Sequence, residues 1–142
     1  MANLLTNVGE EYVIENNANG ETVKVALYDQ STDSISDPDD VASITTEPSG
    51  GAYARQSSPV TTRQIGSDFG FDNDSKIAFD TSDSSTTVDH AAFIVNFQSD
   101  SVSGDSSATD HLIGVAALSQ SRDLSQIDTV EVAAGDLEVT VS

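Results

Sequence analysis

Two histidines, each next to an aspartate, are the residues of this chain best suited to acid–base chemistry. His90 follows Asp89 and His111 follows Asp110, and each pair lies where a strand is expected to begin. A histidine oriented by a carboxylate can act as a general base toward a serine, and serine is abundant here. However, the chain has neither a serine in a nucleophile-elbow context nor a glycine-rich oxyanion motif. We therefore interpret both pairs as polar residues at strand ends and predict that the protein is not an enzyme.

Two groups of acidic residues could bind a hard cation. They lie at residues 37–40 and 72–74, and both offer the oxygen ligands that Ca²⁺ prefers. Neither group has the spacing of an EF-hand loop. The sequence therefore predicts loosely bound cations rather than a cofactor, and the weak candidates for a specific metal site are Asp37, Asp39, Asp40, Asp72 and Asp74.

The stretch EPSGGAYARQ at residues 47–56 is more distinctive. Its two glycines permit a tight turn, after which Tyr53 and Arg55 are expected on the same side of a short strand. Arginine can stack on an aromatic ring or pair with a carboxylate. Because the chain has only 5 Lys and Arg, we expect Arg55 to have an acidic partner. Two interpretations stay open, an ordinary hairpin with an ion pair inside the chain and a strand at a subunit interface.

The charge of the chain is its most unusual property. It carries 24 Asp and Glu against 5 Lys and Arg, a formal net charge of −19 over 142 residues. Because 37% of the residues are hydrophobic and occur in strand-like runs, we expect a folded domain rather than a disordered acidic tail. Concentrated salt screens carboxylate repulsion, since the Debye length falls to roughly 3 Å at about 1 M. We therefore interpret the chain as a protein of a halophile.

The composition also argues against several classes of partner. Nucleic-acid phosphates are bound by clustered Lys and Arg, whereas the cations of this chain are scattered, which also disfavours an anionic membrane surface. No stretch approaches the roughly 20 apolar residues of a membrane span, and the start of the chain lacks the pattern of a signal peptide. With no Cys, neither disulfides nor thiolate metal sites are expected. We therefore predict that neither nucleic acid nor a membrane is a partner.

The spacing of apolar and turn residues predicts about eight short strands. They are expected at residues 21–28, 52–56, 60–65, 75–80, 87–97, 111–118, 127–133 and 137–141. The first alternates as a half-buried strand does, whereas the almost continuously apolar run at 111–118 is typical of a strand buried on both faces. The pattern predicts an all-β fold, an antiparallel β-sandwich or jelly roll with little helix. Residues 1–20 are expected to form an extended N-terminal arm, and residues 21–142 a single domain.

One short helix is expected between the first two strands. Asp37 and Pro38 are typical of a helix start, with Asp37 as N-cap and Pro38 at the first helical position. The helix would run for one or two turns through Val41 and Ile44, and the Pro and Gly residues at 47–51 would end it.

Several of these segments occur together in an order that is found in other proteins. They are an apolar strand at 25–28, an acidic loop with Asp37-Pro38, the stretch at 50–56, an aromatic strand at 88–97 and a terminal Gly-Asp at 135–136. In this order the chain resembles a family of small virion proteins encoded by tailed viruses of bacteria and archaea. Members of that family are head-decoration or tail-associated proteins. Together with the charge, the resemblance implies a haloarchaeal tailed virus and a place in the virion.

The resemblance implies a structural role, and our first hypothesis is a decoration protein or vertex turret on the capsid surface. Copies would assemble as a homo-oligomer and contact other virion proteins such as the major capsid protein. The N-terminal arm would reach a neighbouring subunit, and the predicted interface residues are Leu4, Leu5, Tyr53 and Arg55. Two alternatives stay open. One is a tail, baseplate or fibre component that contacts the host surface, and the other is a carbohydrate- or cation-binding β-sandwich module.

Assembly of so acidic a chain is expected to require salt. Placing monomers of charge −19 side by side multiplies a repulsion that screening relieves. Dilution to low ionic strength should therefore release or unfold the subunit, which sedimentation and circular dichroism would measure. Unchanged assembly in dilute buffer would contradict this expectation.

Overall fold

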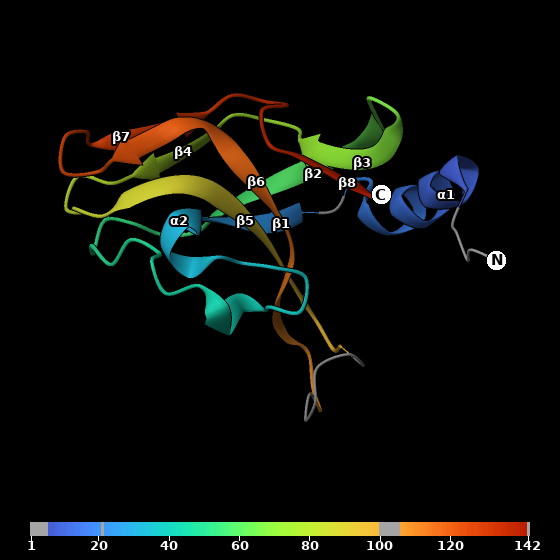
Figure 1. Cartoon of the computed structure of the whole chain (residues 1–142), viewed down its shortest axis with the longest axis horizontal. Helices are drawn as coiled ribbons and strands as arrows, with labels where there is room; N and C mark the ends of the chain where they lie inside the picture. Colours follow the sequence, from blue (N-terminus) through green and yellow to red (C-terminus); the bar gives the residue numbers. More distant parts are fainter. Residues whose placement is uncertain (1–5, 21, 100–105, 142) are drawn as a thin grey trace.

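Six antiparallel strands form one curved sheet, and two further strands form a small second sheet beside it (Figure 1). This computed structural model describes residues 6–20, 22–99 and 106–141. The strand order of the large sheet is β6–β5–β1–β2–β3–β8, and β4 pairs with β7 in the small sheet. The strands in the described part of the chain are β1 (Thr22–Tyr28), β2 (Gln56–Ile65), β3 (Asp68–Asn73), β4 (Ile77–Asp80), β5 (Thr87–Phe97), β6 (Thr109–Asp123), β7 (Thr129–Val132) and β8 (Glu138–Val141).

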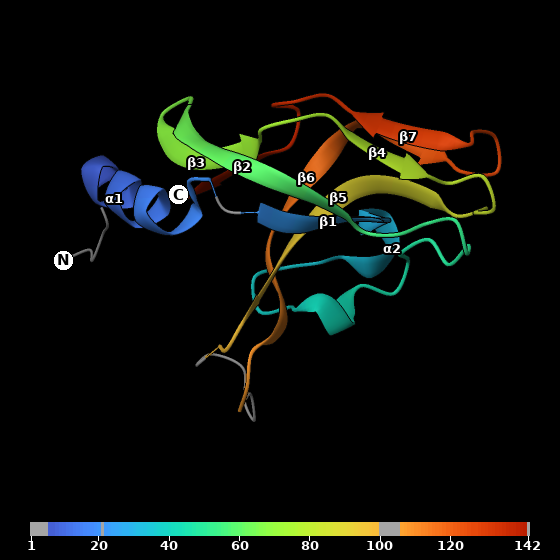
Figure 2. The ribbon, with the colours of Figure 1, turned by 180° about the vertical axis from the view of Figure 1, so that it is seen from behind.

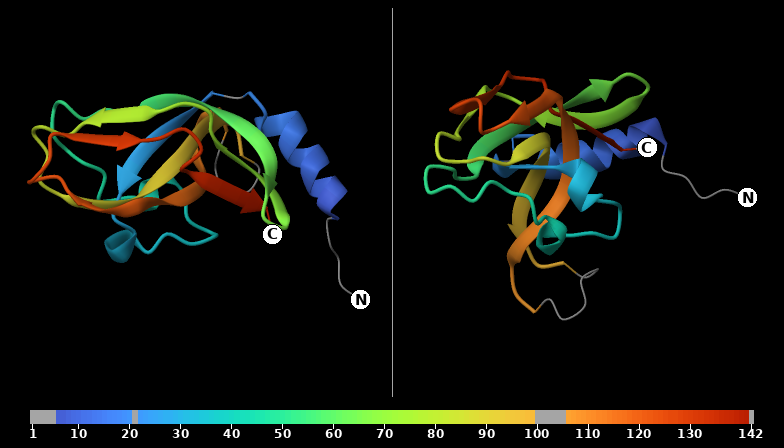
Figure 3. Two further views of the ribbon diagram at one scale, coloured as in Figure 1. Left: turned by 90° about the horizontal axis from the view of Figure 1, so that it is seen from above. Right: turned by 60° about the vertical axis from the view of Figure 1, so that its left-hand side comes forward.

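The large sheet nearly closes on itself, because its two edge strands approach each other. A β-carbon added at Gly114 of β6 would lie 3.0 Å from Cγ1 of Val139 in β8, so the two strands are in contact there. Figure 3 shows the curvature of the sheet from above. The prediction of an all-β antiparallel fold with about eight strands and little helix is confirmed.

The main hydrophobic core lies between the large and the small sheet. Val23, Val25 and Leu27 of β1 are all buried in it, as their alternation predicts. Phe71 of β3 packs edge-on against Phe93 of β5, with ring centroids 5.3 Å apart. Aromatic pairs in this geometry add to the stabilisation from burial alone.

A second buried cluster covers the opposite face of the large sheet. Ala26 and Tyr28 of β1 are completely buried there, and Ile35, Val41 and Ile44 pack against this cluster. The prediction that β1 is half-buried is therefore wrong at its C-terminal end. The reason is that the long connection from β1 to β2 folds back over the outer face of the sheet (Figure 2).

That connection contains two short helical segments, α2 (Gln30–Asp33) and the 3₁₀ helix η1 (Val41–Ser43). The side chain of Asp40 accepts a hydrogen bond from the Val41 amide and caps η1. The predicted helix is thus present only as one turn, and Asp37 is not its N-cap. Asp39 instead accepts a hydrogen bond from the Ser36 amide at 2.8 Å, which holds the preceding residues in a turn.

The strand expected at residues 52–56 is wrong for its first part, because β2 begins only at Gln56. Residues 50–54 form a turn in which the Tyr53 amide donates to the Gly50 carbonyl at 3.2 Å. The Ala52 amide donates to the Asp83 carboxylate at 3.0 Å, which holds this turn against the loop after β4. Long-range hydrogen bonds of this kind compete with a local strand tendency and are invisible in the spacing of residues.

Two other strands also differ from expectation. β3 was not predicted, because its sequence DFGFDN is polar at both ends; it forms as the partner of β2 across a turn in which Gly66 has φ +64°. The prediction that residues 111–118 are buried on both faces is wrong. β6 pairs only with β5 within the described sheet, and Ile113 on it remains 39% exposed.

The N-terminal segment is helical rather than extended, which corrects one detail of the prediction. Helix α1 (Asn7–Ala18) begins at Thr6, whose side chain accepts a hydrogen bond from the Gly9 amide, as N-cap threonines do. The helix packs against β2 and β3 (Figure 1). None of the described helices is long and apolar enough to cross a membrane. The division into an arm and a domain remains a prediction.

Candidate functional site

Arg55 has the acidic partner that the sequence predicts, and the partner is Glu47. The guanidinium donates from Nε to Glu47 Oε2 at 2.9 Å and from Nη2 to Oε1 at 2.9 Å, a bidentate pair. Bidentate arginine–carboxylate pairs are among the stronger charge-assisted contacts. Glu47 and Arg55 lie on either side of the turn at residues 50–54, so the pair holds the two ends of that turn together.

Tyr53 contacts β1 beyond the point where the pairing of β1 with β2 ends. Its hydroxyl accepts from the Leu27 amide at 3.0 Å and donates to Glu47 at 2.8 Å, and its ring stacks on Phe79 with centroids 6.0 Å apart. Burial raises the pKa of the Tyr53 hydroxyl, and the charge of Glu47 adds to this effect, although the hydrogen bond from the Leu27 amide opposes it. These contacts give Tyr53 and Arg55 a role inside the chain. Their contact with another subunit remains a prediction, and the other two interface candidates, Leu4 and Leu5, lie outside the described residues.

Asp110 ties the outer end of β6 to the rest of the molecule. Its carboxylate accepts a hydrogen bond from Asn96 at 3.0 Å and lies 3.8 Å from Lys24 Nζ and 3.7 Å from Arg55 Nη1. The Asn96 hydrogen bond, together with these two cations, lowers the pKa of Asp110. Each of these ion pairs is partly exposed, so each adds only modestly to stability.

His111 pairs with Asp40, and not with the neighbouring aspartate as the sequence suggests. Its Nδ1 lies 2.6 Å from Asp40 Oδ2, and its ring is buried against Phe97 with centroids 5.0 Å apart. Asp40 also accepts from the Leu112 amide at 2.8 Å. β6 is an edge strand of the described sheet, so the backbone amides on its outer side have no neighbouring strand to bond to. Asp40 provides the acceptor for one of these amides, that of Leu112.

Removing the charge of Asp40 is expected to destabilise the fold above pH 4 but not at low pH. Burial raises the pKa of Asp40, but hydrogen bonds from Leu112, His111 and Val41 outweigh it and lower that pKa overall. A lowered pKa contributes stability above the ordinary carboxyl value, and that stability is lost as the pH falls through the folded value. Asp40→Asn should cost about 1–3 kcal/mol at pH 6, and the difference from the unmodified protein should shrink toward pH 3.

Asp39→Asn is the matched control for this experiment. Among the described residues the Asp39 carboxylate bonds to the nearby Ser36 and Ser43 and is partly exposed, so its replacement should change stability much less than Asp40→Asn does. Urea unfolding of the three proteins between pH 3 and pH 6 would measure the difference. An equal cost for both substitutions would show that Asp40 does not hold the edge of β6.

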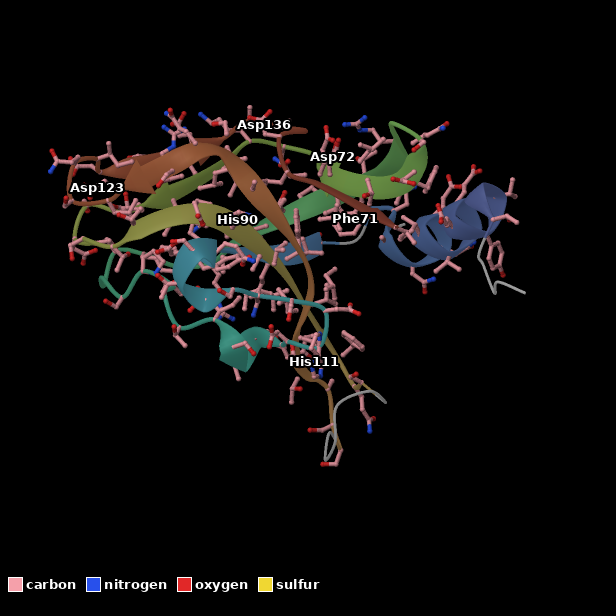
Figure 4. The ribbon with its side chains drawn as sticks, viewed as in Figure 1. Phe71, Asp72, His90, His111, Asp123 and Asp136 are labelled. Atoms are coloured by element: carbon pink, nitrogen blue, oxygen red, sulfur yellow. The ribbon has the colours of Figure 1, made fainter. Side chains whose placement is uncertain are left out.

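His90 lies apart from His111, so the fold does not bring the two histidines together (Figure 4). His90 Nδ1 is 3.1 Å from Asp89 Oδ1, as the sequence suggests, and the ring of Tyr28 lies 5.8 Å away. Asp89 in turn accepts from the Gln30 amide at 2.7 Å, so it also ties α2 to β5. This arrangement fits the interpretation of a polar pair with a structural role.

The five acidic metal candidates do not form one cluster. Asp39 and Asp40 are engaged with serine, histidine and backbone donors. Asp72 is buried and pairs with Arg63 Nε at 2.6 Å on the neighbouring strand. Among the described residues, no group of three or more His, Cys, Asp or Glu could hold a metal ion. Loose association of cations, with these five aspartates as the weak candidates for a specific site, remains a prediction.

An apolar groove between α1 and the large sheet is a feature that the sequence analysis missed. It has a volume of about 560 Å³, and none of the described residues that line it is charged. Val13 and Ile14 line it from the helix, and Phe71, Phe97 and Ile113 line it from the sheet. Phe97 and Ile113 at its rim are 41% and 39% exposed. In the sequence, the groove could have been suspected only from the adjacent apolar residues Val13 and Ile14 on a segment that begins with a helix-capping residue.

Comparison with known families identifies what kind of protein this is. Residues 13–140 match the family model described as podophage GP4 fiber I protein gp80. The chain belongs to this family. The match includes the second half of α1, all of β1 to β7 and nearly all of β8, so it covers both sheets described above. Comparison with curated proteins and with solved structures found no match.

Membership in the fiber I family makes this chain a virion protein of the fibre type. The resemblance to virion proteins of tailed viruses is confirmed to that extent, and so is the predicted place in the virion. The family description names a podophage, so it gives no support to an archaeal origin. It also favours the fibre alternative over the capsid decoration or turret of our first hypothesis.

Proposed function

We propose that this protein is a non-enzymatic structural subunit of the tail fibre apparatus of a tailed virus, where it contacts the host surface and associates with other virion proteins. The observation that carries the proposal is the match to a fibre family over residues 13–140. A decoration or turret on the capsid is the less well supported position, because no comparison favours it.

The chemistry of the described residues agrees with a structural role. The charged residues Glu47, Arg55 and Asp40 bond to other parts of the same chain. These contacts fix the connection between β1 and β2 against the sheet. A domain with such contacts between distant segments suits a structural component of a particle.

Labelling of intact particles would test the position. Antibodies raised against this chain, detected by gold in electron micrographs, should mark the tail or its fibres. Gold distributed over the capsid would contradict the proposal and favour decoration.

Competition for adsorption would test the host contact. Added folded protein should reduce the adsorption of particles to host cells, whereas a Phe93→Ala variant, which lacks a fully buried core ring, should not. Labelled fibres without any competition would contradict host contact by this chain.

A further inference from the structure

Helix α1 has apolar residues on two opposite faces, and one of these faces lines the groove. Val13 and Ile14 line the groove toward the sheet. Val8 and Tyr12 are four residues apart and therefore neighbours on the opposite side of the helix. Val8 lies beside the end of the β2–β3 hairpin. The two side chains are nevertheless 74% and 70% exposed. Each copy of the chain therefore has both an apolar ridge, formed by Val8 and Tyr12, and an apolar groove.

The rim of the groove indicates the size of what covers it. Phe97 and Ile113 are exposed at the rim, next to the exposed Val13 of the helix. A small apolar ligand would occupy the groove but leave these rim side chains in water. A protein surface with a protruding apolar ridge would cover the groove and the rim together, and hydrophobic stabilisation grows with the apolar area removed from water.

Charge indicates which protein surface fits. The chain has a net charge of −19, so a basic partner would be attracted to its acidic surface rather than to a groove without charged lining. The groove instead suits an uncharged apolar ridge, and every copy of this chain carries one. Because none of the described residues that line the groove is charged, the groove itself adds no electrostatic repulsion when a second acidic copy docks there.

We propose that the Val8–Tyr12 ridge of one copy docks in the α1–sheet groove of another copy, and that this contact joins copies of the chain within the particle. The contact uses two different patches, so it is heterologous and can extend from copy to copy or close into a ring. This inference rests on the proposed function in the fibre, for which it names the contact surface.

The charges beside the ridge predict how the contact depends on salt. Glu11 and Glu15 are exposed on the same helix and would approach an acidic neighbour during docking. Their repulsion is long-ranged at about 0.1 M salt, where the Debye length is about 10 Å, and largely screened at about 1 M. Association should therefore strengthen as salt is added.

Cross-linking provides a direct test, because the chain has no Cys of its own. A Val8→Cys variant and a differently tagged Ile113→Cys variant would be mixed at about 1 M salt and treated with a short bismaleimide. We expect cross-links between the two variants. Gln126→Cys is the control for Val8→Cys, since Gln126 is exposed and follows Asp123, which lies at the end of the molecule remote from α1 (Figure 4). Equal cross-linking of the control pair would overturn the proposal.

Sedimentation equilibrium supplies an independent measurement. Tyr12→Ser should raise the dissociation constant about tenfold or more, because it removes a large apolar side chain from the contact. Asn16→Ser, on the same helix, should leave the constant unchanged. Because both residues are exposed, neither change should alter the circular dichroism of the monomer.

Two results would overturn the proposal without affecting the fibre assignment. One is a monomer at both salt concentrations while antibody labelling marks the fibres. The other is an Ile113→Cys cross-link, in intact particles, to a different virion protein and not to a second copy. An unchanged dissociation constant for Tyr12→Ser would exclude the ridge specifically.

Discussion

Replacing Gly70 by alanine should separate β8 from β3 and cost at least about 3 kcal/mol of stability. A β-carbon at Gly70 would overlap the carbonyl oxygen of Val139 and lie 2.9 Å from the Cα of Thr140. Both are backbone atoms of β8, which pairs with β3 from Glu138 to Val141. Since backbone cannot rotate away as a flexible side chain can, the added methyl group must break this pairing.

Denaturant unfolding would measure the loss, and hydrogen exchange would locate it in the amides of β8. Gly51→Ala is the matched control, because a β-carbon there would meet Asp83 only at 3.5 Å, an ordinary contact distance. The control should change stability by about 0.5 kcal/mol or less. An equally small loss of stability for Gly70→Ala would contradict the close approach of β3 and β8 at this position.

Replacing Asn73 by alanine should cost about 2–4 kcal/mol. Asn73 is 1% exposed, and its amide donates to the carbonyls of Ser75 and Ala133, both at 2.9 Å. Its carbonyl oxygen accepts from the Leu137 amide at 3.0 Å. The substitution would leave three backbone groups without this partner, two of them in the connection between β7 and β8, and buried groups without partners are costly.

Thermal and urea unfolding would measure this cost, with Asn16→Ala as the control. The Asn16 amide makes one exposed hydrogen bond to the Tyr12 carbonyl, so its removal should change stability by about 0.5 kcal/mol or less. A loss below 1 kcal/mol for Asn73→Ala would mean that the connection between β7 and β8 is held by other contacts.

The fold class could be predicted because strands leave a local signal. Val23, Val25 and Leu27 alternate with a period of two, and so do Ile77 and Phe79; all five are buried where the period places them. β3 left no such signal. Its residues become a strand through pairing with β2 and β8, and no spacing within six residues shows that pairing.

The candidate site could be predicted only in part, for the same reason. The need of Arg55 for a carboxylate follows from the scarcity of cations, and Glu47 is only eight residues away. The carboxylate that contacts the His111 ring belongs to Asp40, which is 71 residues away. The sequence suggests the neighbouring Asp110 instead, because a contact over that separation leaves no local pattern. The folding of the β1–β2 connection over the sheet decides that pairing.

Properties that depend on composition and on short periods could therefore be predicted from the order of the amino acids alone. These are the all-β fold, the strongly acidic composition and the acidic partner of Arg55, whereas the dependence on salt remains a prediction. Properties that depend on contacts between distant segments become visible only in the folded molecule. They include the covered outer face of β1, the Asp40–His111 contact at the edge of β6, and the groove whose walls are α1 and the sheet. Short-range patterns record which face of an element is apolar, whereas the partner of that face is set by the path of the whole chain.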